Sequence, residues 1–228
     1  MNRSRDLLVI FDLDGTLWDS ARPVADSWNL VLSREDPSLP PLTTEDIHAV
    51  MGLTMTEIAT RLQPALADDR RAELFQECSV FEVAYLRDHP GDLFPEAEAV
   101  LSSLRDAGFP LAIVSNCQRG YVDAFLQGTG LREFFLDWEE WERTGLTKGE
   151  NIRLVMERNG FSRAVYIGDT RKDEEAADFA GIPFIHAAYG FGTADHPAAV
   201  LHALPELPAV LAALRCRPEC AGSEGSRP

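Results

Sequence analysis

The chain has 228 residues, of which 45% are hydrophobic and 25% charged, and its 21 basic and 37 acidic residues give a formal net charge of −16. This length predicts one domain, or one domain with an insert. The negative charge argues against nucleic acid or an anionic membrane as the main partner, and no apolar stretch approaches the ~18 residues that a membrane span needs. Four scattered cysteines and an N-terminus unlike a signal peptide predict a cytoplasmic protein. The oligomeric state is left open.

The first predicted element is a strand over residues 7–11, an apolar run typical of a strand buried on both faces. Asp12, Asp14 and Gly15 follow, and these residue types end a strand in a tight turn. Two carboxylates at the end of a buried strand repel each other and lose solvation, so they require compensation. A bound cation would supply it, and oxygen ligands of this kind suit Mg²⁺. The segment taken alone also fits a strand followed by an Asx-type turn.

Residues 20–88 show helical periodicity and no strand pattern. Prolines at positions 37, 40 and 41 and a glycine at position 52 divide the segment into shorter helices, and residues 89–95 form a Pro- and Gly-containing linker.

The remainder of the chain alternates between helices and short apolar strands. Helices are predicted over residues 96–107, 120–127, 147–158 and 172–180, strands over 110–114, 134–136, 164–167 and 182–187, and two short helices within 197–214. We therefore predict an α/β fold, a doubly wound parallel sheet. Residues 1–17 and 92–220 form this core, residues 18–91 are an all-helical insert after the first strand, and residues 221–228 are a disordered tail.

Polar side chains follow the predicted strands, at the edge of the sheet where ligands bind in such folds. They are Asp12, Asp14 and Thr16 after the first strand, Ser115 and Asn116 after residues 110–114, and Asp169, Thr170 and Asp173 after residues 164–167. Lys148 opens the helix that follows residues 134–136, and it is one of two lysines in the chain. Each group alone also fits a turn, a helix cap or a solvated surface, but together they favour phosphoryl transfer assisted by a metal.

Chemistry assigns a role to each group. Asp12 is the candidate nucleophile that attacks phosphorus, and Asp14 the candidate acid and base for the leaving oxygen and the hydrolytic water. Ser115 and the backbone amides near Gly15 and Asn116 are candidate donors to the transferring oxygens. Lys148 supplies positive charge against the phosphate and the nucleophile.

The same groups predict a metal site. Asp169, together with Asp12, is a candidate ligand of Mg²⁺. Asp173, which follows Asp169 by about one helical turn, either binds metal-bound water or pairs with Lys148.

The segments Phe11-Asp-Leu-Asp-Gly-Thr-Leu17, Val114-Ser-Asn116, Lys148 and Gly168-Asp-Thr-Arg-Lys-Asp173 resemble the four motifs of the haloacid dehalogenase (HAD) superfamily. The resemblance covers nearly the whole chain except the tail, and it is greatest to the phosphoglycolate-phosphatase-like branch. It implies a HAD-like Rossmannoid core, with residues 18–91 as a mobile helical cap of the C1 type. It also implies Asp12 as nucleophile, Asp14 as acid and base with its backbone carbonyl on Mg²⁺, and Asp12 and Asp169 as carboxylate ligands.

The implied activity is Mg²⁺-dependent hydrolysis of a small phosphorylated metabolite through an aspartyl-phosphate intermediate. Phosphoglycolate is the default substrate by resemblance. A phosphomutase of the β-phosphoglucomutase kind, a nucleotide or sugar phosphatase and a pyrophosphatase remain alternatives. A response-regulator receiver, a signalling module with similar side chains, is disfavoured because its phospho-acceptor lies on a later strand and it has no helical insert.

Residues that contact the substrate are harder to predict. Thr16 and Gly52 are candidates, because Thr16 belongs to the first motif and Gly52, at a helix break, permits close approach to the core. Arginines in the helical segment are candidates for a substrate carboxylate or second phosphate: Arg22, Arg34, Arg61, Arg70, Arg71 and Arg87.

Overall fold

The computed structural model describes residues 7–216 of the chain. The predicted tail, residues 221–228, lies outside the described residues, as do residues 1–6 and 217–220 of the predicted core. No helix among the described residues is long and apolar enough to cross a membrane.

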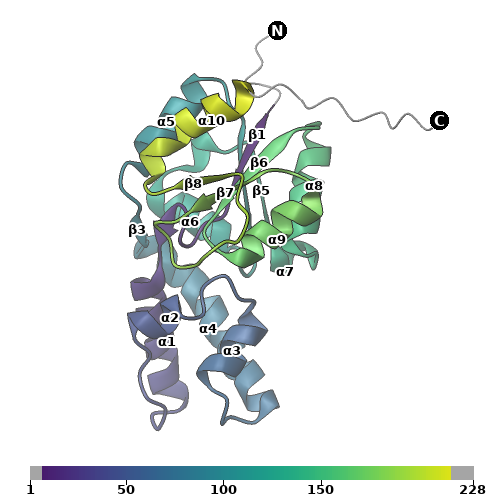
Figure 1. The fold of residues 1–228 in the computed structure, drawn as a ribbon. Helices are drawn as coiled ribbons and strands as arrows, with labels where there is room; N and C mark the ends of the chain where they lie inside the picture. The colour runs from purple at the N-terminus through teal and green to yellow at the C-terminus, as the bar shows by residue number, and fades with distance from the viewer. Residues whose placement is uncertain (1–6, 217–228) are drawn as a thin grey trace, which may run out of the picture.

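A six-stranded parallel sheet forms the centre of the molecule, as the sequence predicts (Figure 1). Its order is β5-β4-β1-β6-β7-β8, and its strands are β1 (Leu8–Phe11), β4 (Leu111–Ser115), β5 (Asp137–Glu140), β6 (Ala164–Gly168), β7 (Phe184–Ala187) and β8 (Ala199–Leu201). After β1 the chain first builds the sheet outward through β4 and β5, and then returns to the other side of β1 with β6. This reversal leaves a crevice at the carboxyl end of β1, where ligands bind in doubly wound sheets.

Helices cover both faces of the sheet, because side chains along each strand alternate between the faces. Val9 and Phe11 pack on one face with α5 (Ala97–Asp106), α6 (Tyr121–Thr129) and α10 (Leu207–Cys216). Leu8 and Ile10 pack on the other face with α8 (Lys148–Arg158) and α9 (Arg171–Ala180). Both faces of β1 are therefore buried, which explains its uninterrupted apolar sequence.

The segment between β1 and β4 contains α1 (Ala21–Glu35), α2 (Thr44–His48), α3 (Met55–Leu62) and α4 (Asp68–Asp88). These helices extend away from the sheet on the side of the carboxyl end of β1 (Figure 1). Two short strands that the sequence did not predict, β2 (Trp18–Asp19) and β3 (Asp92–Leu93), pair antiparallel where the chain enters and leaves this segment. The pairing fixes the two connections side by side.

Two predicted elements of the sheet were wrong. The strand predicted over residues 134–136 lies at Asp137–Glu140, after a short 3-10 helix at Arg132–Phe134. The acidic sequence of Asp137–Glu140 does not look like a buried strand. In the structure, Glu139 forms ion pairs with Arg143 (2.8 Å) and Arg158 (2.6 Å). Glu140 accepts hydrogen bonds from the backbone at the start of α6. Residues 197–214, predicted as two helices, contain the edge strand β8, a 3-10 turn at Leu204–Glu206 and most of α10, so one of the two helices is present.

Candidate active site

Asp12 lies at the carboxyl end of β1, in the centre of the sheet, and is 3% exposed. Its backbone N–H donates to the Ile167 carbonyl at 2.8 Å, which continues the pairing with β6 to the last residue. The turn that follows requires Gly15, whose φ is +78°. A Cβ at this position would lie 2.3 Å from Oδ2 of Asp169. Gly15 therefore lets the first turn pack directly against the acid that ends β6.

Lys148 is buried beside Asp12. Its Nζ lies 3.1 Å from Asp12 Oδ2 and 2.6 Å from Asp173 Oδ1. Thr147 caps the helix that begins at Lys148, in a reciprocal capping box with Glu150, and thereby fixes where the lysine emerges. Of the two roles predicted for Asp173, the geometry contains the ion pair with Lys148. Both neighbouring carboxylates raise the pKa of Lys148, against the opposing effect of burial, so the ammonium stays charged.

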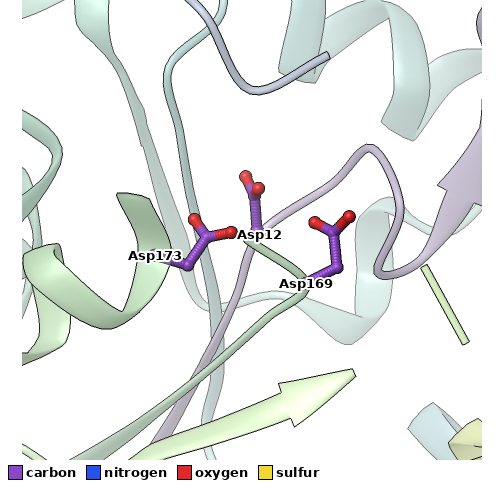
Figure 2. Close-up of side chains that lie close together, drawn as sticks. All are labelled: Asp12, Asp169 and Asp173. Carbon is purple, nitrogen blue, oxygen red and sulfur yellow. The ribbon is translucent and has the colours of Figure 1, made fainter. Parts of the chain in front are cut away.

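Asp12, Asp169 and Asp173 form a cluster in which one carboxylate oxygen from each lies within 4.8 Å of the others (Figure 2). Burial is the main cause that raises the pKa of Asp12 to about 7, with Lys148 opposing it. Burial and the two neighbouring acids raise the pKa of Asp169 to about 8. One lysine therefore does not compensate the cluster fully.

The chemistry of the cluster fits a magnesium ion, with two buried oxygens as candidate ligands. Asp12 Oδ1 and Asp169 Oδ1 have no hydrogen-bond partner, and hard carboxylate oxygens of this kind are the ligands that Mg²⁺ prefers. The oxygens of Asp173 are already engaged, because Oδ1 binds Lys148 and Oδ2 accepts from the Thr170 backbone N–H at 2.9 Å. Asp173 thus orients the lysine and caps α9, whereas Asp12 and Asp169 have oxygens free for a cation.

Asp14 leaves the strand and lies half-buried on the side of the helical segment. Its Oδ1 accepts hydrogen bonds from Ser20 at 2.5 Å and from Tyr121 at 3.0 Å. Burial raises the pKa of Asp14 to about 6, although these two hydroxyls favour its charged form. A carboxyl group with such a pKa can give and take a proton near neutral pH. Sequence reasoning missed Ser20 and Tyr121, and the separation of 101 positions between them left no local signal.

A cavity opens between these groups and the helical segment. Asp12, Asp14, Ser115 and Asn116 line it from the core, and Gly52 lines it from the loop between α2 and α3. Ser115 lies beside Asp12 and opposes the rise in its pKa. The structure therefore brings together five of the predicted site residues around one space.

Thr16, a predicted substrate contact, and Gly15, a predicted phosphate-binding position, are not in this space. Thr16 is fully buried and Gly15 packs against Asp169, and neither lines the cavity. Thr16 is instead held in the core, where its carbonyl accepts a 2.8 Å hydrogen bond from Tyr189. The structure thus gives no support to a direct contact between Thr16 and the substrate.

Sequence reasoning also missed two polar side chains of the cavity, Glu82 and Gln118. Glu82 is 3% exposed on α4. The sequence does contain a signal for Glu82. It lies four residues after Cys78 and four before Leu86, so helical periodicity places it on the buried face of α4. A carboxylate on an apolar stripe is the observation that would have identified it.

Comparison with known proteins places this geometry in a family. The family model of haloacid dehalogenase-like hydrolases matches residues 9–187. A phosphoglycolate phosphatase of Caulobacter vibrioides is 30% identical over 191 residues, which is 80% of this chain and 79% of that protein. A plasmid-encoded phosphoglycolate phosphatase of Cupriavidus necator is 28% identical over 221 residues, 92% of this chain and 95% of that protein.

Solved structures share the fold. A haloacid dehalogenase-like family protein from Streptococcus pneumoniae superposes with a TM-score of 0.78 at 22% identity, covering 90% of this chain and 98% of that one. CbbY from Rhodobacter sphaeroides, solved with xylulose 1,5-bisphosphate, has a TM-score of 0.72 at 18% identity, over 88% of this chain and 95% of that one. The chain belongs to the haloacid dehalogenase-like hydrolase family, as the four motifs and the match over residues 9–187 establish.

Proposed function

We propose that this hydrolase is a Mg²⁺-dependent phosphatase that cleaves a small phosphomonoester through an aspartyl-phosphate intermediate. The observation that carries the proposal is the contact of Lys148 with Asp12 at 3.1 Å, beside the two partnerless oxygens of Asp12 and Asp169. This combination offers a nucleophile, a fixed positive charge and a place for a cation at one strand end.

In the first step, an oxygen of Asp12 forms a bond to phosphorus while the bond from phosphorus to the ester oxygen breaks. Asp14 gives its proton to the departing oxygen, which leaves as an alcohol. Lys148, Ser115 and the backbone near Asn116 offer positive charge and hydrogen bonds to the transferring phosphoryl oxygens.

In the second step, a water molecule attacks the same phosphorus and gives a proton to Asp14. The bond between phosphorus and Asp12 breaks, inorganic phosphate leaves, and both carboxyl groups return to their starting states. The hydrogen bonds from Ser20 and Tyr121 hold Asp14 in one orientation for both proton transfers.

Mg²⁺ would be held by Asp12 and Asp169, with the Asp14 carbonyl as the third protein ligand that family resemblance implies. When bound, it screens the carboxylates and polarises the phosphoryl group. The cluster itself supports this assignment, because neutralising two buried acids of raised pKa requires more charge than Lys148 supplies.

We also propose that α1–α4 act as a cap that excludes water from the site. Residues of α2, α3 and the loop between them line the cavity together with Asp12 and Asp14. An ion pair joins α3 to the core, where Lys172 on α9 lies 2.9 Å from Glu57. The buried free thiols Cys78 and Cys117 agree with a reducing, cytoplasmic setting.

Phosphate release from a panel of phosphomonoesters, with Mg²⁺ and with EDTA, tests the proposal. Phosphoglycolate heads the panel because the relatives are named for it, and sugar phosphates, nucleotides and pyrophosphate complete it. We expect release that requires Mg²⁺ and disappears in Asp12→Asn. Phosphate release by the Asp12→Asn variant would contradict the proposed mechanism. Absence of release from every ester would move the assignment to a phosphomutase, which would interconvert phosphorylated sugars instead.

A further inference from the structure

The cavity between core and cap is small and mostly apolar. In this arrangement of the cap it offers about 60 Å³ to water-sized molecules, several times the ~10–15 Å³ that one water needs. Its walls include Trp28, Ile47, Val50, Met51 and Met55 from the cap. The cavity adjoins Asp14, the proposed proton donor to the leaving oxygen, so the alcohol half of the substrate enters it.

No lysine, arginine or histidine is among the side chains that line this cavity in the described part of the chain. The cap arginines predicted to meet a substrate anion lie elsewhere. Arg34 pairs with Glu77 at 3.0 Å and Arg22 with Asp92 at 3.7 Å, and Arg71 pairs with Asp68. Lys148, together with a cation on Asp12 and Asp169, would serve the phosphoryl group. A second anion on the alcohol half would therefore find no counter-charge.

Instead, the cavity contains a buried acid and a buried amide. One oxygen of Glu82 accepts a 2.6 Å hydrogen bond from Trp28 Nε1. The side-chain amide of Gln118 approaches the same carboxyl group closely enough to favour its charged form and is 6% exposed, but its buried Nε2 has no partner at hydrogen-bond geometry. A buried donor without a partner is unfavourable by about 1–3 kcal/mol, so a ligand that supplies an acceptor there would be stabilised.

Glu82 complements this donor. Burial raises the pKa of Glu82 to about 8, so near neutral pH the carboxyl group can donate or accept a hydrogen bond, and a cationic partner would favour its charged form. A hydroxyl group can donate to Glu82 and accept from Gln118 at once, and an ammonium group can donate to Glu82. A carboxylate can accept from Gln118, but no cation in the lining of the cavity offsets its charge, and the ionised forms of Asp14 and Glu82 repel it.

We propose that Glu82 and Gln118 are the specificity-determining residues of this cavity, and that the alcohol half of the substrate is uncharged or cationic and carries a hydroxyl or amino group. This inference rests on the proposed phosphatase activity and narrows its substrate class away from carboxylated esters such as phosphoglycolate.

Four two-carbon phosphomonoesters test the inference. They are 2-hydroxyethyl phosphate, phosphoethanolamine, ethyl phosphate and phosphoglycolate. With Mg²⁺ present, we expect kcat/KM for the hydroxyl and amino esters to exceed that for ethyl phosphate by about ten- to a hundredfold, as one or two buried hydrogen bonds would give. Phosphoglycolate should rank last.

Variants then assign the preference to the two side chains. Glu82→Leu and Gln118→Leu should each reduce the preference for 2-hydroxyethyl over ethyl phosphate by about tenfold. Glu82→Gln, which keeps hydrogen-bonding groups, should preserve the preference for the hydroxyl ester but reduce that for phosphoethanolamine through KM. Glu77→Gln, an exposed acid on the same helix, is the matched control and should leave all four values unchanged. Thermal unfolding of each variant checks that the fold is intact.

The outcomes separate this inference from the proposed function. If phosphoglycolate has the highest kcat/KM and Asp12→Asn abolishes release, the phosphatase assignment stands and the inference fails. Equal values for 2-hydroxyethyl and ethyl phosphate would also overturn the inference, as would release from acetyl phosphate but from none of the four esters. If neither the esters nor acetyl phosphate release phosphate, the proposed function fails and the inference falls with it.

Discussion

The ammonium of Lys148 donates a 2.6 Å hydrogen bond to Asp173, and neither side chain is more than 4% exposed. The pair joins the start of α8 to the start of α9, and the lysine also reaches Asp12 at 3.1 Å. One buried cation therefore serves two acids that come from different elements. In the proposed mechanism, folding stability and catalysis therefore share the same charge.

Replacing the cation tests this relationship. We expect Lys148→Met to lower the free energy of unfolding by about 3–5 kcal/mol near pH 8, because two buried acids lose their partner. The loss should shrink near pH 5, where Asp12, with its pKa of about 7, is protonated. Urea unfolding at both pH values measures the effect. Lys172→Met, which removes the exposed pair with Glu57, is the control and should change stability by less than about 1 kcal/mol.

Stability of the metal-free protein should fall as pH rises from about 4 to about 8. The pKa values of Asp12 and Asp169 are raised to about 7 and about 8, so the folded state binds more protons than the unfolded state across this window. Stability then decreases with pH until both groups are ionised. Asp14 and Glu82, whose pKa values are also raised, contribute in the same direction.

At saturating Mg²⁺, folding stability should depend less on pH. The ion stabilises the charged forms of Asp12 and Asp169 and so removes their contribution to the pH dependence. Urea unfolding with Mg²⁺ and with EDTA, at several pH values, measures the difference. The effect should be absent in Asp169→Asn. An equal effect of Mg²⁺ in that variant would place the ion elsewhere.

Asp14→Asn should separate proton transfer from the attack of Asp12. The variant cannot protonate the leaving oxygen, so hydrolysis of an alkyl phosphate should slow by about 10²–10⁴-fold. Formation of the aspartyl-phosphate from acetyl phosphate, whose leaving group needs no proton, should change far less. Rapid-quench measurement of both reactions provides the comparison. Similar losses for both donors would contradict the role assigned to Asp14.

Gly15→Ala and Gly130→Ala separate backbone strain from the approach of Gly15 to Asp169. Both glycines have positive φ, +78° and +73°, so backbone strain alone should cost each alanine variant about 1–2 kcal/mol of stability. A Cβ on Gly15 would meet Asp169 Oδ2 at 2.3 Å, whereas nothing lies within 4 Å of one on Gly130. We expect Gly15→Ala alone to lose Mg²⁺ affinity, measured by calorimetry. Full retention of affinity would refute the role assigned to this turn.

The sequence predicted the sheet where burial on both faces demands apolar strands. β1, β4 and β6 were identified because their residues are almost all hydrophobic. β5 was missed because its sequence is acidic. Arg143 and Arg158 pair with Glu139, and Arg158 follows Glu139 by nineteen positions, so the sequence carries no local sign of the pairing. β2 and β3 were missed because two-residue strands carry no periodicity.

For the site, the sequence by itself determined which chemical groups stand at the strand ends, because parallel strands bring their carboxyl ends to one edge. Asp12, Asp14, Ser115, Lys148 and Asp169 follow from that rule. The tertiary structure alone decided the pairing of Lys148 with Asp173, the support of Asp14 by Ser20 and Tyr121, and the cavity that joins Glu82 to Gln118. These contacts join residues 6 to 107 positions apart. The Lys148–Asp173 pair depends on how α8 packs beside α9, and the others depend on how α1–α4 pack against the sheet domain, which local residue patterns do not encode.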